Sequence, residues 1–236
     1  MDNIHNLIRE NRLFSEYQPL IKSDNEKIFA YEALMRTTPW TNPLTVFEQA
    51  REHNLLFELD TVCIMNAIKG YPKEYLSKHL LFINIFPSTV IHDKFESFLK
   101  SVSEAFPKLK NRIVFEINET ENEQKLWWQT QFLNRLVLLK RFGYSVAFDD
   151  LSISKASLKK LELLTPDFVK LDHTKGKDLS QSVAKQQLIS LFLEYTNEKM
   201  KLVLEGIEEK ADLEVARKLG VPLLQGYYIS KPKKLS

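Results

Sequence analysis

The sequence predicts an α/β fold, a (β/α)8 barrel built as one domain over residues 1–236. Short apolar runs rich in β-branched and aromatic residues alternate with longer stretches of helical period, an order typical of a parallel sheet covered by helices. The length of 236 residues is close to the roughly 250 residues of one such barrel. Hydrophobic residues make up 44% and charged residues 27%, a composition that suits a globular chain with a substantial core.

Eight segments are predicted as strands, because each is a short apolar run bounded by polar or turn residues. In chain order they are residues 14–17, 28–35, 80–85, 112–117, 145–148, 168–171, 202–204 and 223–225. No low-complexity linker or internal repeat separates them, which favours a single barrel over two domains.

Helical periodicity fills the intervals between these strands. The clearest example is the set Ala184, Leu188, Leu191, Phe192 and Tyr195, which recurs at helical spacing. A longer helix is predicted over residues 123–142, with Leu126, Leu133, Leu136 and Val137 on its inner face. Further helices are predicted over residues 58–69 and 210–219, the second closed by Gly220 just past its last turn.

Charge and cysteine content exclude several classes of protein. There are 33 basic and 31 acidic residues, a net charge of +2, so no general attraction to DNA, RNA or an anionic membrane is expected. Cys63 is the only cysteine and lies in an apolar run. With one cysteine the chain can form neither an internal disulfide nor a zinc site built from several cysteines. No apolar stretch reaches the roughly 20 residues that span a bilayer, and the N-terminus shows no secretory signal. We expect a cytoplasmic protein.

Polar residues interrupt the apolar strands near their C-terminal ends, where barrels of this class carry their active sites. These residues are Glu32, Asn84, Glu116, Asp149, Asp150, Lys170, Glu205 and Gln225. A polar side chain inside an apolar strand costs a few kcal/mol unless it is paired or ligated. Each has an ordinary alternative when taken alone: a salt-bridged glutamate, a satisfied core amide, or a helix N-cap at the paired aspartates.

Taken together, the strand ends predict a metal centre. Five carboxylates and an amide converge on one rim with a single lysine; the like charges of the carboxylates would repel one another, and divalent cations relieve such repulsion. The ligands are all oxygen, and the five histidines lie elsewhere, which favours Mg²⁺ or Mn²⁺ over zinc or copper. Two ions bridged by a carboxylate are a standard arrangement for phosphodiester cleavage.

Seven ordered motifs resemble those of the EAL-domain cyclic di-GMP phosphodiesterases, from about residue 14 to residue 232. They are Glu32-Ala33-Leu34 with Arg36, Asn84, Glu116 with Glu119, Asp149-Asp150, Lys170 with Asp172, Glu205 with Glu208, and Gln225-Gly226-Tyr227. The resemblance implies a barrel whose first strand is antiparallel to the others, hydrolysis of cyclic di-GMP to the linear dinucleotide, and frequent assembly into a homodimer.

The same resemblance implies a role for each matching residue. Glu32, Asn84, Glu116 and Asp149 would hold one Mg²⁺ or Mn²⁺ ion, and Asp149 with Asp150 a second. Lys170 and Glu205 would position and activate water. Arg36, Gln18 and Gln225 would contact the substrate, and Glu119, Asp172 and Glu208 would support the loops around the site.

One segment departs from the family pattern. After the paired aspartates the family usually has Phe-Gly-Thr/Ser-Gly, whereas this chain has Leu151-Ser152-Ile153-Ser154. Two glycines, which tolerate positive φ and close backbone approach, are replaced by serine. The leading hypothesis is an active phosphodiesterase, and the alternative is a weak or inactive module that binds cyclic di-GMP or a protein partner as a regulator. A third reading, an enolate-forming enzyme with Lys170 as base, has no recognition motif in its favour.

Overall fold

The computed structural model describes residues 4–118, 121–149, 155–196 and 199–235. Within them, eight strands close into one barrel in sequence order. The strands are β1 (Leu13–Lys22), β2 (Ile28–Thr37), β3 (Leu80–Ile85), β4 (Ile113–Asn118), β5 (Ser145–Asp149), β6 (Phe168–Leu171), β7 (Lys201–Leu204) and β8 (Leu223–Leu224). Strand β1 is antiparallel to both neighbours, and all other adjacent pairs are parallel. The predicted barrel with an antiparallel first strand is therefore confirmed.

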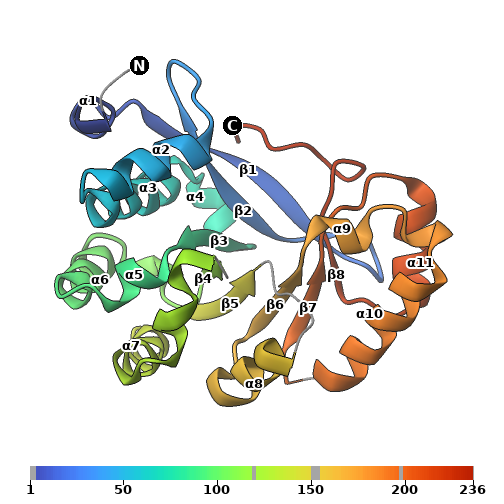
Figure 1. Cartoon of the computed structure of the whole chain (residues 1–236). Coiled ribbons are helices and arrows are strands. Elements are labelled where there is room, and N and C mark those ends of the chain that lie inside the picture. The colour runs from blue at the N-terminus through green and yellow to red at the C-terminus, as the bar shows by residue number, and fades with distance from the viewer. Residues whose placement is uncertain (1–3, 119–120, 150–154, 197–198, 236) are drawn as a thin grey trace.

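Helices surround the barrel on its outer side (Figure 1). The α-helices are α1 (Ile4–Arg9), α2 (Pro43–Glu52), α3 (Leu56–Gly70), α4 (Lys73–Leu76), α5 (Pro87–Ile91), α6 (Phe95–Ala105), α7 (Thr130–Arg141), α8 (Lys155–Leu164), α9 (His173–Gly176), α10 (Val183–Thr196) and α11 (Lys210–Lys218). Three 3₁₀ helices are η1 (Pro107–Leu109), η2 (Glu121–Trp128) and η3 (Leu179–Gln181). In the described residues, no helix is long and apolar enough to cross a membrane.

Two apolar layers hold the barrel together. The larger layer lies between the outer faces of the strands and the helices, and includes Leu81, Phe115 and Phe148. The smaller layer fills the inside of the barrel with one side chain from each strand. Its members are Leu20, Ala30, Phe82, Val114, Ala147, Phe168, Val203 and Leu223. We call this inner layer the barrel floor. Successive strand residues point to opposite faces, so it fixes which residues of each strand face inward.

The predicted helix over residues 123–142 is two elements in the structure. The 3₁₀ helix η2 ends at Trp128, and α7 begins at Thr130 after Gln129 in extended conformation. Trp127 is completely buried, with its ring 4.7 Å from that of Phe148. Within α7 the buried face runs through Phe132, Leu136 and Leu139, so Val137 is 52% exposed although it was predicted to face inward.

The other predicted helices are present. The one over residues 58–69 is α3 and the one over residues 210–219 is α11, followed by Gly220 with φ of 82°. In α10, Phe192 is buried as predicted, but Leu191 is 63% exposed, because the buried face runs through Ile189, Phe192 and Thr196.

Candidate active site

The candidate site residues form one layer directly above the barrel floor. In the parallel strands they lie two positions after the floor residues: Glu32 after Ala30, Asn84 after Phe82, Glu116 after Val114, Asp149 after Ala147, Lys170 after Phe168, Glu205 after Val203, and Gln225 after Leu223. Gln18 lies two positions before Leu20, because β1 runs the opposite way. A spacing of two keeps a side chain on the same face of its strand. The alternation of each strand therefore directs all eight side chains into the same end of the barrel.

Lys170 lies at the centre of this layer and is completely buried. Its Nζ atom is 2.6 Å from Glu205 Oε1, 2.8 Å from Glu116 Oε1, 3.1 Å from Glu32 Oε2 and 3.5 Å from Asp149 Oδ1. These four carboxylates come from β2, β4, β5 and the end of β7. One ammonium therefore contacts four acidic side chains that lie far apart in the sequence.

Burial and like charge shift the pKa values of this cluster. Burial raises the pKa of Glu116 well above its usual value, and the Glu32 carboxylate raises it further. Burial also raises the pKa of Glu205 to about 8, although Lys170 opposes this shift. Burial lowers the pKa of Lys170, but the carboxylates, led by Asp149, raise it well above its usual value. The pKa of Glu32 is raised by burial but lowered more by Lys170 and its other partners, so it lies below its usual value.

Amide side chains complete the layer. Asn84 Nδ2 lies 3.3 Å from Glu32 Oε1 and 3.4 Å from Glu116 Oε2. On the other side, Gln225 Nε2 donates to Glu32 Oε2 at 2.7 Å and to Gln18 Oε1 at 3.2 Å. These bonds hold Glu32 in place from two sides.

Asn118 belongs to the site although the sequence analysis did not select it. Its Nδ2 donates to Asn84 Oδ1 at 2.9 Å, which orients the Asn84 amide. The signal was present in the sequence, because Asn118 follows Glu116 by two positions on β4 and therefore lies on the same face.

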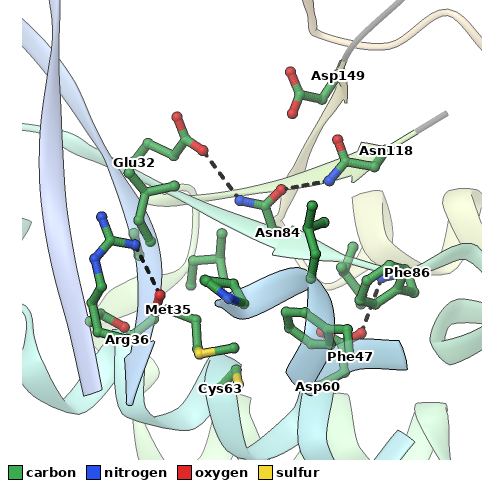
Figure 2. A pocket seen from close by; sticks show the side chains of 18 residues that line it. Glu32, Met35, Arg36, Phe47, Asp60, Cys63, Asn84, Phe86, Asn118 and Asp149 are labelled. Carbon is green, nitrogen blue, oxygen red and sulfur yellow. Dashed lines mark hydrogen bonds between the residues drawn. The ribbon is translucent and has the colours of Figure 1, made fainter. Parts of the chain in front are cut away.

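A cavity of about 360 Å³ opens beside these residues. Figure 2 shows Glu32, Asn84, Asn118 and Asp149 at one end and Phe47 and Phe86 toward the other, apolar end. Arg36 lines the same cavity. It does not contact the carboxylate cluster, because its Nε donates to Glu16 Oε2 at 2.8 Å and another nitrogen to the Met35 carbonyl at 2.9 Å.

The loop after β3 is held by a second acidic pair that the sequence analysis missed. Asp60 Oδ2 accepts from the backbone N–H of Phe86 at 3.0 Å, and Glu123 Oε2 accepts from that of Ser88 at 2.8 Å. Glu123 also pairs with Arg51. Asp60 and Glu123 are only 2% exposed, so they fix the backbone that follows Asn84.

The residues predicted to support the loops lie at the edge of the site or outside the described residues. Asp172 is the N-cap of α9 and accepts from the Thr174 backbone N–H at 2.8 Å. Glu208 pairs with Lys177 at 3.3 Å. Asp150 and Glu119 fall outside the described residues, as does the segment Leu151-Ser152-Ile153-Ser154.

Close backbone packing places the segment after β6 against the end of β7. A Cβ atom added to Gly176 would lie 1.9 Å from the carbonyl oxygen of Glu205, and one added to Gly206 would lie 2.0 Å from that of His173. Gly206 also has a φ of 77°, which other residues rarely adopt. These glycines let the loop carrying α9 approach Glu205.

The donor set fits a hard divalent cation. Glu32, Glu116 and Asp149 offer carboxylate oxygens and Asn84 an amide oxygen, which Mg²⁺ and Mn²⁺ prefer. One buried ammonium does not balance four carboxylates, so added positive charge would relieve their repulsion. Among the residues that the structure describes, no three acidic or histidine side chains already converge on one ion position. The Lys170 ammonium lies between the carboxylates instead.

The EAL domain model matches residues 1–232 of the chain. Among curated proteins, the chain is 23% identical to the probable cyclic di-GMP phosphodiesterase PdeG of Escherichia coli, with 95% of this chain and 45% of that protein covered. It is 25% identical to the EAL-domain containing protein YkuI of Bacillus subtilis, with 92% of this chain and 54% of that protein covered. The chain thus spans about half the length of these curated relatives.

Solved structures show the same fold. An EAL domain protein from Listeria monocytogenes aligns with a TM-score of 0.83 at 25% identity, covering 98% of this chain and 93% of that chain. The EAL domain of FimX from Xanthomonas citri, solved in complex with cyclic di-GMP, aligns with a TM-score of 0.85 at 18% identity, covering 99% and 92%. The family model covers nearly the whole chain, and the barrel matches the solved EAL domains. The chain therefore belongs to the EAL-domain family, the family of the cyclic di-GMP phosphodiesterases.

Proposed function

We propose that this protein hydrolyses cyclic di-GMP to the linear dinucleotide pGpG in a reaction that requires Mg²⁺ or Mn²⁺. The site would bind two such ions. The observation that carries the proposal is the buried layer in which Glu32, Glu116, Asp149 and Glu205 surround Lys170 at the C-terminal end of the barrel. A protein without catalytic chemistry has no physical need to keep four carboxylates in contact. Named relatives that are cyclic di-GMP phosphodiesterases support the substrate.

The metal would be held by the oxygen donors of the layer. Glu32, Asn84, Glu116 and Asp149 would ligate one ion, and Asp149 with Asp150 the second. A bound divalent ion lowers the pKa of water and stabilises negative charge on a phosphoryl group. Asn118 would orient Asn84 by donating to its amide oxygen, and the second lone pair of that oxygen would ligate the ion.

Lys170 and Glu205 would position and activate the attacking water. Lys170 can hold water or a phosphate oxygen by donating from its ammonium, and Glu205, 2.6 Å away, can accept a proton. The water oxygen forms a bond to one phosphorus of the cyclic substrate, and the bond from that phosphorus to the ribose 3′-oxygen breaks. The 3′-oxygen takes up a proton, so one water is consumed and a 5′-phosphate remains on the linear product.

Arg36, Gln18 and Gln225 would bind the substrate around this centre. Arg36 lines the cavity beside the carboxylates, and its guanidinium suits a phosphate group. In the described structure it is paired with Glu16, so a phosphate would compete with that carboxylate. The resemblance also predicts a homodimer, which sedimentation equilibrium would test.

The alternative function is a regulatory module that binds cyclic di-GMP or a protein partner without turnover. One feature of the sequence favours the regulatory module: Leu151-Ser152-Ile153-Ser154 has serine where the family pattern has two glycines. Changes in the residues that support metal ligands can lower activity by about 10–100-fold.

A turnover assay tests the proposal against this alternative. Purified protein is incubated with cyclic di-GMP and Mg²⁺, Mn²⁺ or a chelator, and the products are separated by chromatography. We expect pGpG only with metal, and loss of product in Glu32→Ala. Binding of cyclic di-GMP without product would refute the enzymatic proposal and support the regulatory module. Neither binding nor turnover would refute the enzymatic proposal and leave, of the alternative, only a module that binds a protein partner.

A further inference from the structure

A second cavity opens at the opposite end of the barrel from the carboxylate layer. Its volume is about 710 Å³, and it lies among the C-terminal end of α3, helix α4, the segment after α6, and Arg112 just before β4. Arg112, which immediately precedes β4, lies four residues before Glu116, and at about 3.3 Å per residue this separates them by roughly 13 Å. We call it the basal cavity.

The basal cavity has a strongly basic rim. Lys69, Lys73, Lys108 and Arg112 line it, and no acidic residue does. In the part of the chain that the structure describes, none of these four pairs with a carboxylate. The chain as a whole is nearly neutral, with a net charge of +2, so this concentration of unpaired positive charge is local.

The floor of the basal cavity is apolar. Ile68, Leu76, Phe106, Pro107 and Leu109 line it. Ligand pockets commonly have volumes of about 300–1,000 Å³ and combine apolar walls with a few polar groups. The basal cavity has that size and that composition.

Tyr71 adds a polar group that has no partner. It lines the basal cavity and is 3% exposed. Its hydroxyl oxygen is buried without a hydrogen-bond partner among the described residues, whereas the hydroxyl of the neighbouring Tyr17 donates to the Ala67 carbonyl at 2.8 Å. That oxygen is closed to solvent, and the Tyr71 ring packs against the rings of Tyr17 and Tyr75, so Tyr71 forms part of the cavity wall.

We propose that the basal cavity binds a small ligand that joins a phosphate group to an aromatic ring, such as a nucleoside monophosphate. The phosphate carries close to two negative charges at neutral pH and faces the basic rim, where the Arg112 guanidinium matches its geometry. The ring packs on the apolar floor beside Phe106. This site is independent of the proposed function, because it shares no residue with the carboxylate layer.

Calorimetric titration with AMP and with phenyl phosphate tests the proposal on the intact chain. We expect saturable binding of at least one with a dissociation constant below about 1 mM, and at least about 10-fold weaker binding of inorganic phosphate and of adenosine. Arg112→Gln should weaken binding about 10-fold or more, since it removes a charge-assisted hydrogen bond. Lys108→Gln, which removes a second positive charge from the rim, should weaken it about 5-fold. Lys218→Gln, which removes the same charge from an exposed position on α11, is the matched control and should bind as the wild type does.

Hydrogen exchange locates the ligand without any substitution. Amides of residues 69–77 and 105–112 should gain protection with AMP or phenyl phosphate, and those around Glu32 and Asn84 should not. Absence of saturable binding would overturn the proposal. So would binding that is unaffected by both Arg112→Gln and Lys108→Gln, or protection confined to the carboxylate end of the barrel.

Discussion

Replacing Lys170 by methionine should destabilise the metal-free protein strongly. Methionine keeps the length and apolar stem of lysine but removes the ammonium that contacts Glu32, Glu116, Asp149 and Glu205, at 2.6 to 3.5 Å. The carboxylates would remain close together in a buried layer without a compensating charge. Removing one partner of a buried ion pair costs about 3–5 kcal/mol, because the remaining charge stays desolvated. We expect a loss of that size in the free energy of unfolding.

Urea unfolding with and without Mg²⁺ measures this effect. The free energy of unfolding of Lys170→Met should fall by about 3–5 kcal/mol in chelator. Mg²⁺ should restore part of it, because an ion at 100 times its dissociation constant stabilises the folded state by about 2.7 kcal/mol. The control is Lys177→Met, since Lys177 forms a 3.3 Å pair with Glu208 and its side chain is 51% exposed. Such surface pairs contribute at most about 1 kcal/mol.

Two results would refute this reasoning. If Lys170→Met lost no more stability than Lys177→Met, the carboxylates would not depend on the ammonium. If Mg²⁺ stabilised neither Lys170→Met nor the wild type, the layer would not bind the metal, and the proposed function would lose its chemical basis. A change in the slope of the unfolding free energy with urea would show instead that the substitution altered the denatured state.

Three other substitutions test neighbouring contacts. Asn118→Ala removes the donor to Asn84 and should weaken Mg²⁺ binding about 10-fold in a calorimetric titration; unchanged affinity would contradict the assigned role. Gly176→Ala places a Cβ 1.9 Å from the Glu205 carbonyl, so the protein should lose about 1–3 kcal/mol of stability and turnover should fall; wild-type kcat would show that the close approach is dispensable. Burial raises the pKa of Asp60 from 3.8 to about 7, so the folded state holds a proton that the unfolded state releases. The free energy of unfolding should therefore fall as pH rises between these values, and Asp60→Asn should lack this component in urea titrations across that range.

The strands and most of the site could be predicted from the sequence because both depend on local alternation. Each strand is a short apolar run, and each polar residue that interrupts it lies two positions beyond an inward-facing apolar residue, as Glu116 does beyond Val114. A period of two fixes the face of a side chain without knowledge of its partners. The convergence of Glu32, Asn84 and Lys170 then follows from closure of the barrel.

Partners that lie far apart in the sequence could not be predicted in the same way. Arg36 matches a substrate-binding position of the family, but its hydrogen bond to Glu16 depends on the antiparallel register of β1 and β2. The contact between Asp60 and the loop at Phe86 depends on how α3 lies against β3. Val137 was placed on the wrong face because packing against the rest of the barrel buries the face of α7 that runs through Phe132, Leu136 and Leu139.

Within the same strands, the barrel floor stabilises the fold, and the charged layer above it carries the candidate catalytic groups. The floor contributes one apolar side chain per strand and includes ring contacts such as that of Phe82 with Phe168, 5.0 Å apart. Burial of such side chains stabilises the fold whether or not a ligand is bound. The layer two residues further along opposes folding, because its carboxylates are desolvated and mutually repulsive. A chain that needed only the fold would place apolar residues in both layers. The repeated polar interruption at the same height in the strands is therefore a functional signal that a single buried glutamate would not provide.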